Sequence, residues 1–307
     1  MSMDLFAGIL TGLLVAATPL ILAALGELVA EKSGVLNLGV EGMMVIGAIA
    51  GFAAKIATGS YALAFLAAMG GGALMALLFG ILTQVFMSNQ VASGLALTLF
   101  GLGVSALFGA GYTGVTAGTF PRLDALGFGG RLASGVDGLM LVALGLVVLT
   151  HLVLERTRAG LVLRAVGENH DAAHAIGFPV VRVRLLALAF GGAMAGLGGA
   201  YLSLVQTPFW VERMTAGRGW IALALVVFAA WRPFRMLAGA LLFGGISILQ
   251  LHSQGFGLKI DAQILSMLPY LATIAVLVLI SRDPAGRGSK QGLRAPQSLG
   301  QVFTGSG

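Results

Sequence analysis

The sequence predicts an all-α protein that crosses a membrane many times. Of its 307 residues, 58% are hydrophobic and only 10% are charged, whereas roughly 25% are charged in an average soluble domain. The mean hydropathy is +0.96. The apolar residues gather in stretches suited to a bilayer core of about 30 Å, which a helix of about 20 residues crosses. Short polar turns separate the stretches, so residues 1–281 are interpreted as one transmembrane domain.

Nine such stretches are expected to form helices. They lie at residues 5–26, 34–54, 61–86, 91–110, 137–154, 185–205, 217–231, 236–251 and 264–281, of which the seventh and eighth are short. No basic residue precedes the first stretch, so it lacks the charged start of a cleaved signal peptide and is expected to remain as a span.

The basic residues predict an orientation, because Lys and Arg concentrate on the cytoplasmic side of membrane proteins. If the polar segment 155–184 is cytoplasmic, strict alternation places the turn 232–235 and the tail after residue 281 on the same side, with most of the 18 Lys and Arg. We therefore expect a multi-pass protein of the cell (inner) membrane with its N-terminus outside and its C-terminus inside. The Gly-, Ser-, Arg- and Gln-rich tail at 282–307 is expected to be disordered.

An internal echo raises the possibility of an inverted repeat. Residues 72–80 read Gly-Ala-Leu-Met-Ala-Leu-Leu-Phe-Gly, and residues 239–244 read Gly-Ala-Leu-Leu-Phe-Gly. In the expected topology their spans run in opposite directions, as the halves of many transporters do. Chance similarity between two low-complexity segments is the alternative interpretation.

Polar residues in the second span are candidates for a substrate path, because polar groups inside a membrane are costly and often functional. Ser33, Asn37 and Glu41 follow one another at four-residue spacing, which places them on one helical face. The alternative is a hydrogen-bond network that only holds helices together. Glycines at 34, 39, 42 and 47 favour a bent or interrupted helix, which would free backbone groups to line a cavity.

The other polar positions allow simpler interpretations. Asn89, Gln90 and Ser93 open the fourth span and either line the path or start the helix. Glu27, Glu31 and Lys32 are expected at a solvated helix end.

The sequence contains no signature of catalysis or metal binding. It has no cysteine, no H-E-x-x-H pair of metal ligands and no G-x-x-x-x-G-K-[ST] phosphate loop. We therefore expect no enzyme activity, no metal and no cofactor in this chain. The 18 Lys and Arg form no run, so no nucleic-acid partner is expected either.

The segment 155–184 is the one sizeable polar stretch between spans, and it has the signals of an ordered helix. Asp171 stands where a short helix could begin, Gly177 where it could end, and Pro179 follows. Such a helix at the membrane surface suits docking, although an arginine-rich connector is the alternative.

The same segment carries a family resemblance. Asp171-Ala172-Ala173-His174-Ala175-Ile176-Gly177 resembles the E-A-A-x-x-x-G coupling motif of ATP-binding-cassette (ABC) importer permeases, with Asp in place of the usual Glu. Residues 156–177 are similar to the version in permeases for branched-chain amino acids, ribose and nucleosides. Two further segments resemble simple-sugar and nucleoside (guanosine-type) uptake permeases: 31–44 (Glu-Lys-Ser-Gly-Val-Leu-Asn-Leu-Gly-Val-Glu-Gly-Met-Met) and 214–224 (Met-Thr-Ala-Gly-Arg-Gly-Trp-Ile-Ala-Leu-Ala). The likeness runs from about residue 5 to 281.

The resemblance implies a permease subunit that forms the path for nucleosides or simple sugars by alternating access. ATP would be bound by separate ABC ATPase subunits, a second related permease would complete the channel as a heterodimer, and an extracytoplasmic binding protein would deliver the cargo. The residues it implies for coupling to the ATPase are Arg164, Gly167, Glu168, Asp171, Ala172, Ala173 and Gly177. An external gate or delivery-protein contact is expected at Gln206, Phe209, Trp210, Thr215 and Arg218. The alternative function is an ion-coupled secondary transporter of small polar solutes, which would need an ion or proton site.

Overall fold

The computed structural model describes residues 3–123, 135–253 and 295–305, together with the separate residues 267, 271, 274, 275 and 278. Within these residues every named element is a helix or helical turn, and the only β-type pairing consists of two isolated bridges. The ninth predicted span, 264–281, lies outside the described residues apart from those five positions.

The described part of the chain contains ten α-helices. In order they are α1 (Met3–Lys32), α2 (Val40–Thr58), α3 (Tyr61–Gly80), α4 (Gln90–Gly109), α5 (Gly138–Arg156), α6 (Arg158–Glu168), α7 (His170–Ala175), α8 (Val180–Tyr201), α9 (Arg218–Phe228) and α10 (Pro233–Ser253). The π-helical turns η1 (Ile81–Val85) and η4 (Leu202–Gln206) prolong α3 and α8, and the 3-10 turn η2 (Ala110–Tyr112) prolongs α4.

Six of these helical stretches are long and apolar enough to cross a membrane, and they match the first six predicted spans. They are Gly8–Lys32, Val40–Thr58, Tyr61–Val85, Gln90–Tyr112, Gly138–Arg156 and Val180–Gln206. Two shorter apolar helices, Arg218–Phe228 and Pro233–Ile248, follow at the positions of the short seventh and eighth predicted spans.

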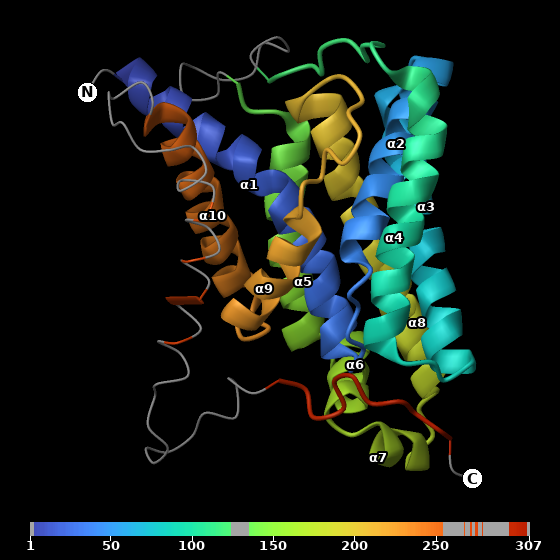
Figure 1. Ribbon diagram of the computed structural model, residues 1–307. Coiled ribbons are helices and arrows are strands. Elements are labelled where there is room, and N and C mark those ends of the chain that lie inside the picture. The colour runs from blue at the N-terminus through green and yellow to red at the C-terminus, as the bar shows by residue number, and fades with distance from the viewer. Residues whose placement is uncertain are drawn as a thin grey trace.

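The long helices form one bundle, and its two ends carry different parts of the chain. Figure 1 shows α1 beginning at one end, whereas α6, α7 and the segment 295–305 gather at the opposite end. The helix α8 runs through the bundle and packs most extensively against α3 and α1, then against α2. We call the end that carries α6 and α7 the α7 end.

Glycine lets α2, α3 and α8 meet backbone to backbone. A Cβ atom on Gly199 of α8 would overlap the Met44 carbonyl of α2, and one on Gly72 of α3 would overlap the Gly192 carbonyl of α8. Lipid supplies no hydrophobic force between helices, so such close approach is what holds a membrane bundle together.

The predicted second span is wrong at its start, because the chain between α1 and α2 is not helical. Gly34 has φ +91°, which L side chains rarely adopt, and the Asn37 side chain accepts a hydrogen bond from the Gly39 N–H at 3.0 Å. This local bond competes with helix formation. Helix α2 therefore begins only at Val40, and Ser33, Asn37 and Glu41 do not share a helical face. The interruption itself agrees with the glycine pattern.

A second interruption precedes α9. After η4 the chain continues without a helix until Arg218, and α9 is only 11 residues long. At 1.5 Å per residue this is about 16 Å, roughly half the thickness of a bilayer core.

Candidate functional site

The starts of α2 and α9, each preceded by a non-helical connection, meet at the carboxylate of Glu41, in the first turn of α2. Its Oε1 accepts hydrogen bonds from the Thr215 hydroxyl at 2.6 Å and the Gly217 N–H at 2.9 Å, and its Oε2 accepts one from the Gly219 N–H at 2.6 Å. Gly217 and Gly219 flank the start of α9. The carboxylate therefore caps the N-terminus of α9, where free N–H groups and the helix dipole favour a negative charge.

This junction lies in the middle of the bundle. Gly42 packs directly against the backbone of Leu97 and Thr98, near the centre of the 20-residue helix α4. The Thr98 hydroxyl also donates to the Leu38 carbonyl at 3.1 Å. The start of α2, the start of α9 and the centre of α4 are thus at one level, as at the broken helices that form sites in many transporters.

Asn37 belongs to a second buried pair beside this junction. Its backbone N–H and its side-chain amide donate to the two carboxylate oxygens of Glu27 at 3.2 and 3.3 Å. Glu31, one turn further along α1, accepts a hydrogen bond from the indole N–H of Trp231 at 2.5 Å. Glu27 and Glu31 are each 1% exposed, so the expected solvated helix end is wrong for these two residues.

The candidates at the start of α4 divide into two kinds. Asn89 accepts a hydrogen bond from the Ala92 N–H at 3.0 Å and so caps the helix, while the Ser93 hydroxyl lies 2.8 Å from that of Ser88. Gln90 instead reaches the α1–α2 connection, because its Oε1 accepts from the Leu36 N–H at 2.8 Å. Asn89 and Ser93 thus have local partners, and only Gln90 joins the interrupted segment.

A buried arginine at the α7 end was missed by the sequence analysis. Arg184 lies in the first turns of α8 and is 0% exposed, whereas the sequence analysis used it only as one of the basic residues that set the orientation. Its guanidinium donates to the Ser33 carbonyl at 3.2 Å, to Gln84 Oε1 at 3.0 Å and to the Gln301 carbonyl at 3.2 Å. No carboxylate among the described residues lies within ion-pair distance of it. The charge is satisfied by neutral acceptors from separate parts of the chain.

His170 supplies the remaining partner of this arginine. Its Nδ1 lies 3.1 Å from Arg184 Nη2; because the guanidinium can only donate, Nδ1 accepts and the imidazole proton sits on Nε2. Nε2 in turn lies 3.5 Å from Asp171 Oδ1. Burial and then the positive charge of Arg184 lower the pKa of His170, and Asp171 partly opposes them. The ring is therefore held neutral.

The predicted coupling residues form a surface with a buried underside. Glu168, Asp171, Ala172 and Gly177 are exposed, whereas Ala173 is buried under α7 and Gly167 packs on the Lys32 carbonyl. Arg164 is partly exposed and lies 3.5 Å from Glu155.

A glycine turn ends α7. The Gly177 N–H donates to the His174 carbonyl at 2.8 Å and the Phe178 N–H to the Ala173 carbonyl at 3.0 Å, with Gly177 at φ +93°. This is a Schellman motif, and it leaves Ile176 72% exposed at the tip.

The predicted external residues lie between the last residue of η4 and the first residue of α9. Trp210 is buried against Gly109 of α4, and Phe209 is 43% exposed. Thr215 is turned inward to Glu41, as described above, and Arg218 donates to the Met214 and Thr215 carbonyls. Gln206 Oε1 is buried and accepts no hydrogen bond from a described residue.

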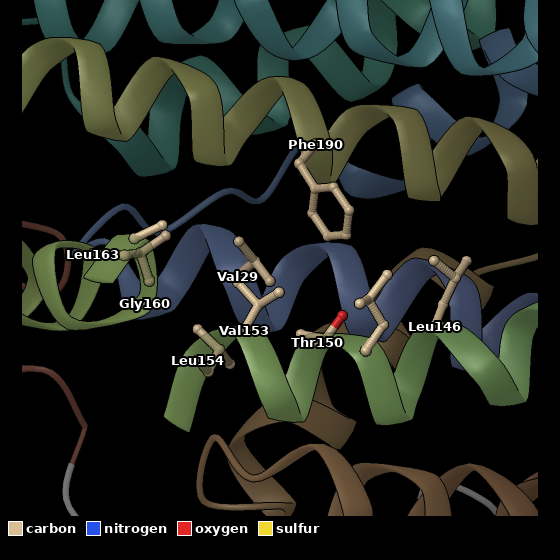
Figure 2. A pocket seen from close by; sticks show the side chains of 10 residues that line it. Val29, Leu146, Thr150, Val153, Leu154, Gly160, Leu163 and Phe190 are labelled. Atoms are coloured by element: carbon tan, nitrogen blue, oxygen red, sulfur yellow. The ribbon is translucent and has the colours of Figure 1, made fainter. Parts of the chain in front are cut away.

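A cavity of about 190 Å³ lies at the interface of α1, α5, α6 and α8. Figure 2 shows Val29, Leu146, Val153, Leu163 and Phe190 around it, with Thr150 as the one labelled hydroxyl. Its apolar lining gives a polar solute few partners. Among the described residues, no group of three or more His, Cys, Asp or Glu could hold a metal.

The comparison with known families identifies the class of protein. The family described as "branched-chain amino acid transport system / permease component" matches residues 9–280. The chain belongs to this permease family. The permease is therefore a transport subunit rather than an enzyme, and its family works with separate ATPase subunits and a binding protein. Membership of this family argues against the alternative function, an ion-coupled secondary transporter.

Three relatives are similar to the permease over most of their length. The putative glucose ABC transporter permease protein TsgC13 of Haloferax volcanii is 44% identical over 90% of this chain and 92% of its own. The guanosine ABC transporter permease protein NupQ of Bacillus subtilis is 34% identical over 86% of this chain and 89% of its own. The nucleoside ABC transporter permease protein NupC of Lactococcus lactis is 32% identical over 88% of this chain and 91% of its own.

Proposed function

We propose that this permease forms the membrane path of an ABC importer for an uncharged nucleoside or simple sugar. The observation that carries the proposal is the junction of α2 and α9 in the middle of the bundle, where two non-helical connections meet and the Glu41 carboxylate accepts three hydrogen bonds. Relatives named for glucose, guanosine and nucleosides support this cargo class. Asn37, Glu41, Gln90 and Ser33 contribute to the walls of the path in this proposal, with Asn89 and Ser93 at its edge.

The proposal includes nine spans arranged as an inverted repeat. One half would be α1, the connection to α2, α2 and α3; the other would be α8, the connection to α9, α9 and α10. Figure 1 supports it, because α2 and α9 run in opposite directions from their junction, as do α3 and α10. The sequence echo 72–80 and 239–244 falls on α3 and α10, which occupy matching places in this scheme. The ninth span would be 264–281.

The α7 end is cytoplasmic in this proposal, with the N-terminus outside. Support comes from the arginines of α5, α6 and the α9–α10 turn, which favour the cytoplasmic side. The connection 207–217 would then face outward, where the exposed Phe209 would meet a binding protein and the buried Trp210 would act as an outer gate. A second, related permease would complete the path as a heterodimer.

Coupling is assigned to α7. The exposed Asp171, Ala172 and Ile176 offer a docking surface, and Ala173 fixes the helix to the bundle through its buried side. Closure of the ATPases would push on α7 and reorient the helices that meet at Glu41.

The test is Gly177→Val in the complete importer reconstituted in proteoliposomes. A β-branched residue at φ +93° is strained, so the end of α7 would shift and ATP-driven uptake of guanosine or glucose would fall at least tenfold while insertion persists. Gly145→Val is the matched control, because a Cβ there meets nothing within 4 Å. Uptake near the wild-type rate in Gly177→Val would refute the coupling role. Absence of ATP-driven uptake of any sugar or nucleoside by the wild-type importer would refute the proposed function.

A further inference from the structure

The segment 295–305 is folded back onto the α7 end of the bundle, as the red trace beneath α6 in Figure 1 shows. Its backbone makes a turn in which the Leu299 N–H donates to the Pro296 carbonyl and the Gln301 N–H to the Ser298 carbonyl. Ser298 is 3% exposed and Phe303 is 8% exposed. Burial at this level is typical of a seated peptide rather than of a free tail.

One side of this segment holds the coupling elements. The Ser298 N–H donates to the Gly167 carbonyl of α6 at 2.9 Å, and the Ser298 hydroxyl accepts from the His170 N–H of α7 at 3.2 Å. The Phe303 ring stands edge-on to the rings of His170 and His174, with centroids 5.4 and 5.2 Å away. Phe303 also shares an apolar cluster with Val166, Ala173 and Val180.

The other side of this segment contacts the α1–α2 connection and the first turns of α8 and α4. The Gly300 N–H donates to the Gly34 carbonyl at 3.2 Å. The Gln301 carbonyl accepts from Arg184 at 3.2 Å and from Gln90 at 3.4 Å. Six residues, 298–303, thus join α6 and α7 to the α1–α2 connection, α8 and α4.

We propose that the segment 295–305 is an autoinhibitory latch, which ties the coupling helix α7 to the inner mouth of the path and must leave α7 when the ATPases close. This inference rests on the proposed function. A peptide that bonds two elements stabilises their present arrangement, so movement of α7 relative to the α1–α2 connection has to break its contacts. Ile176 and Asp171 stay exposed with the segment in place. The ATPase can therefore dock on a latched permease, and the latch opposes the stroke rather than the docking.

The functional test compares ATP hydrolysis by reconstituted importers without binding protein or cargo. Removal of residues 295–307, or Phe303→Ala, is expected to raise basal hydrolysis about fivefold or more, the lower end of typical coupling between sites. Adding a synthetic peptide of sequence 295–307 to the truncated importer should lower it again. Thr304→Ala, at an exposed neighbouring position, is the control that should leave hydrolysis unchanged.

Phe303→Ala keeps the test decisive if the truncated chain does not assemble. Basal hydrolysis within twofold of wild type in an assembled Phe303→Ala importer overturns the latch.

A positional test separates the latch from the proposed function. The chain has no native cysteine, so Ala175→Cys with Thr304→Cys can be cross-linked by a short bifunctional thiol reagent. These exposed residues adjoin His174 and Phe303 in the chain, and replacing them leaves the contact between the two rings in place. High yield is expected in the nucleotide-free importer, with a drop of at least threefold when vanadate traps the ATPases closed. Equal yield in both states overturns release of the latch from α7, even if uptake is ATP-driven. High yield in an importer that moves no sugar or nucleoside would leave the seated segment standing and refute the proposed cargo.

Discussion

Glu41→Gln distinguishes a structural clamp from a group that touches cargo. In the structure the carboxylate accepts three hydrogen bonds that fix the start of α9. A glutamine oxygen can replace Oε1 toward Thr215 and Gly217, but its NH₂ group would face the Gly219 N–H as a second donor. Hydrogen bonds to charged groups contribute about 1.5 to 3 kcal/mol each, neutral ones about 0.5 to 1.5, and a buried unpaired donor costs about 1 to 3. The expected loss of stability is therefore about 3 to 6 kcal/mol.

The assay is thermal unfolding in detergent, followed by tryptophan fluorescence. The chain has three tryptophans, and Trp220 adjoins Gly219, whose N–H binds the Glu41 carboxylate. A loss of this size lowers the midpoint by about 6 °C or more at roughly 2 to 4 °C per kcal/mol. Glu212→Gln is the matched control, because this side chain is 64% exposed and its one ion pair within the described part of the chain, to Arg213, is 3.9 Å long. A Glu41→Gln variant that unfolds like wild type but no longer transports would refute the clamp and assign the carboxylate to the cargo.

Two further predictions concern helix packing and pH. Gly199→Leu should prevent α8 from reaching the Met44 backbone, and the loss of stability should exceed the usual overpacking cost of about 1 to 3 kcal/mol. Size-exclusion chromatography should show aggregation of this variant. The control Gly103→Leu, with open space around it, should elute as wild type. The lowered pKa of His170 means that the unfolded chain takes up a proton near pH 6.5 that the folded chain refuses, so stability should be greatest above this pH and fall below it. Thermal unfolding at pH 7.5 and 5.5 checks this, and His170→Asn should reduce the difference; an unchanged difference would show that other groups cause it.

The sequence was sufficient for the long helices, because span length and hydropathy are local properties. All six helices that meet the membrane criteria had been expected, and the glycines at 34 and 39 had indicated the break before α2. The precise start of α2 depends on the Asn37 side chain bonding its own backbone, which a hydropathy pattern does not contain.

The partners of the polar groups could not be predicted, because they are far apart in the chain. Glu31 was assigned to a solvated end, yet its partner Trp231 lies 200 residues away. Arg184 was counted with the topogenic arginines, and only the fold brings Ser33, Gln84 and Gln301 to its guanidinium. A sequence alone shows that burying such polar groups is costly. It does not show which residues will satisfy them by hydrogen bonds.

The glycine contacts among α2, α3 and α8 restrict how this molecule can move. Helices that touch through their backbones cannot slide past one another without opening voids or colliding. We therefore expect α2, α3 and α8 to move as one rigid unit during transport. Motion is then left to helices such as α5, whose Gly138 and Gly145 approach no neighbouring backbone. The cavity of Figure 2 lies between α1 and α8 on one side and α5 and α6 on the other. It provides free volume at the border where the mobile part of the molecule would swing.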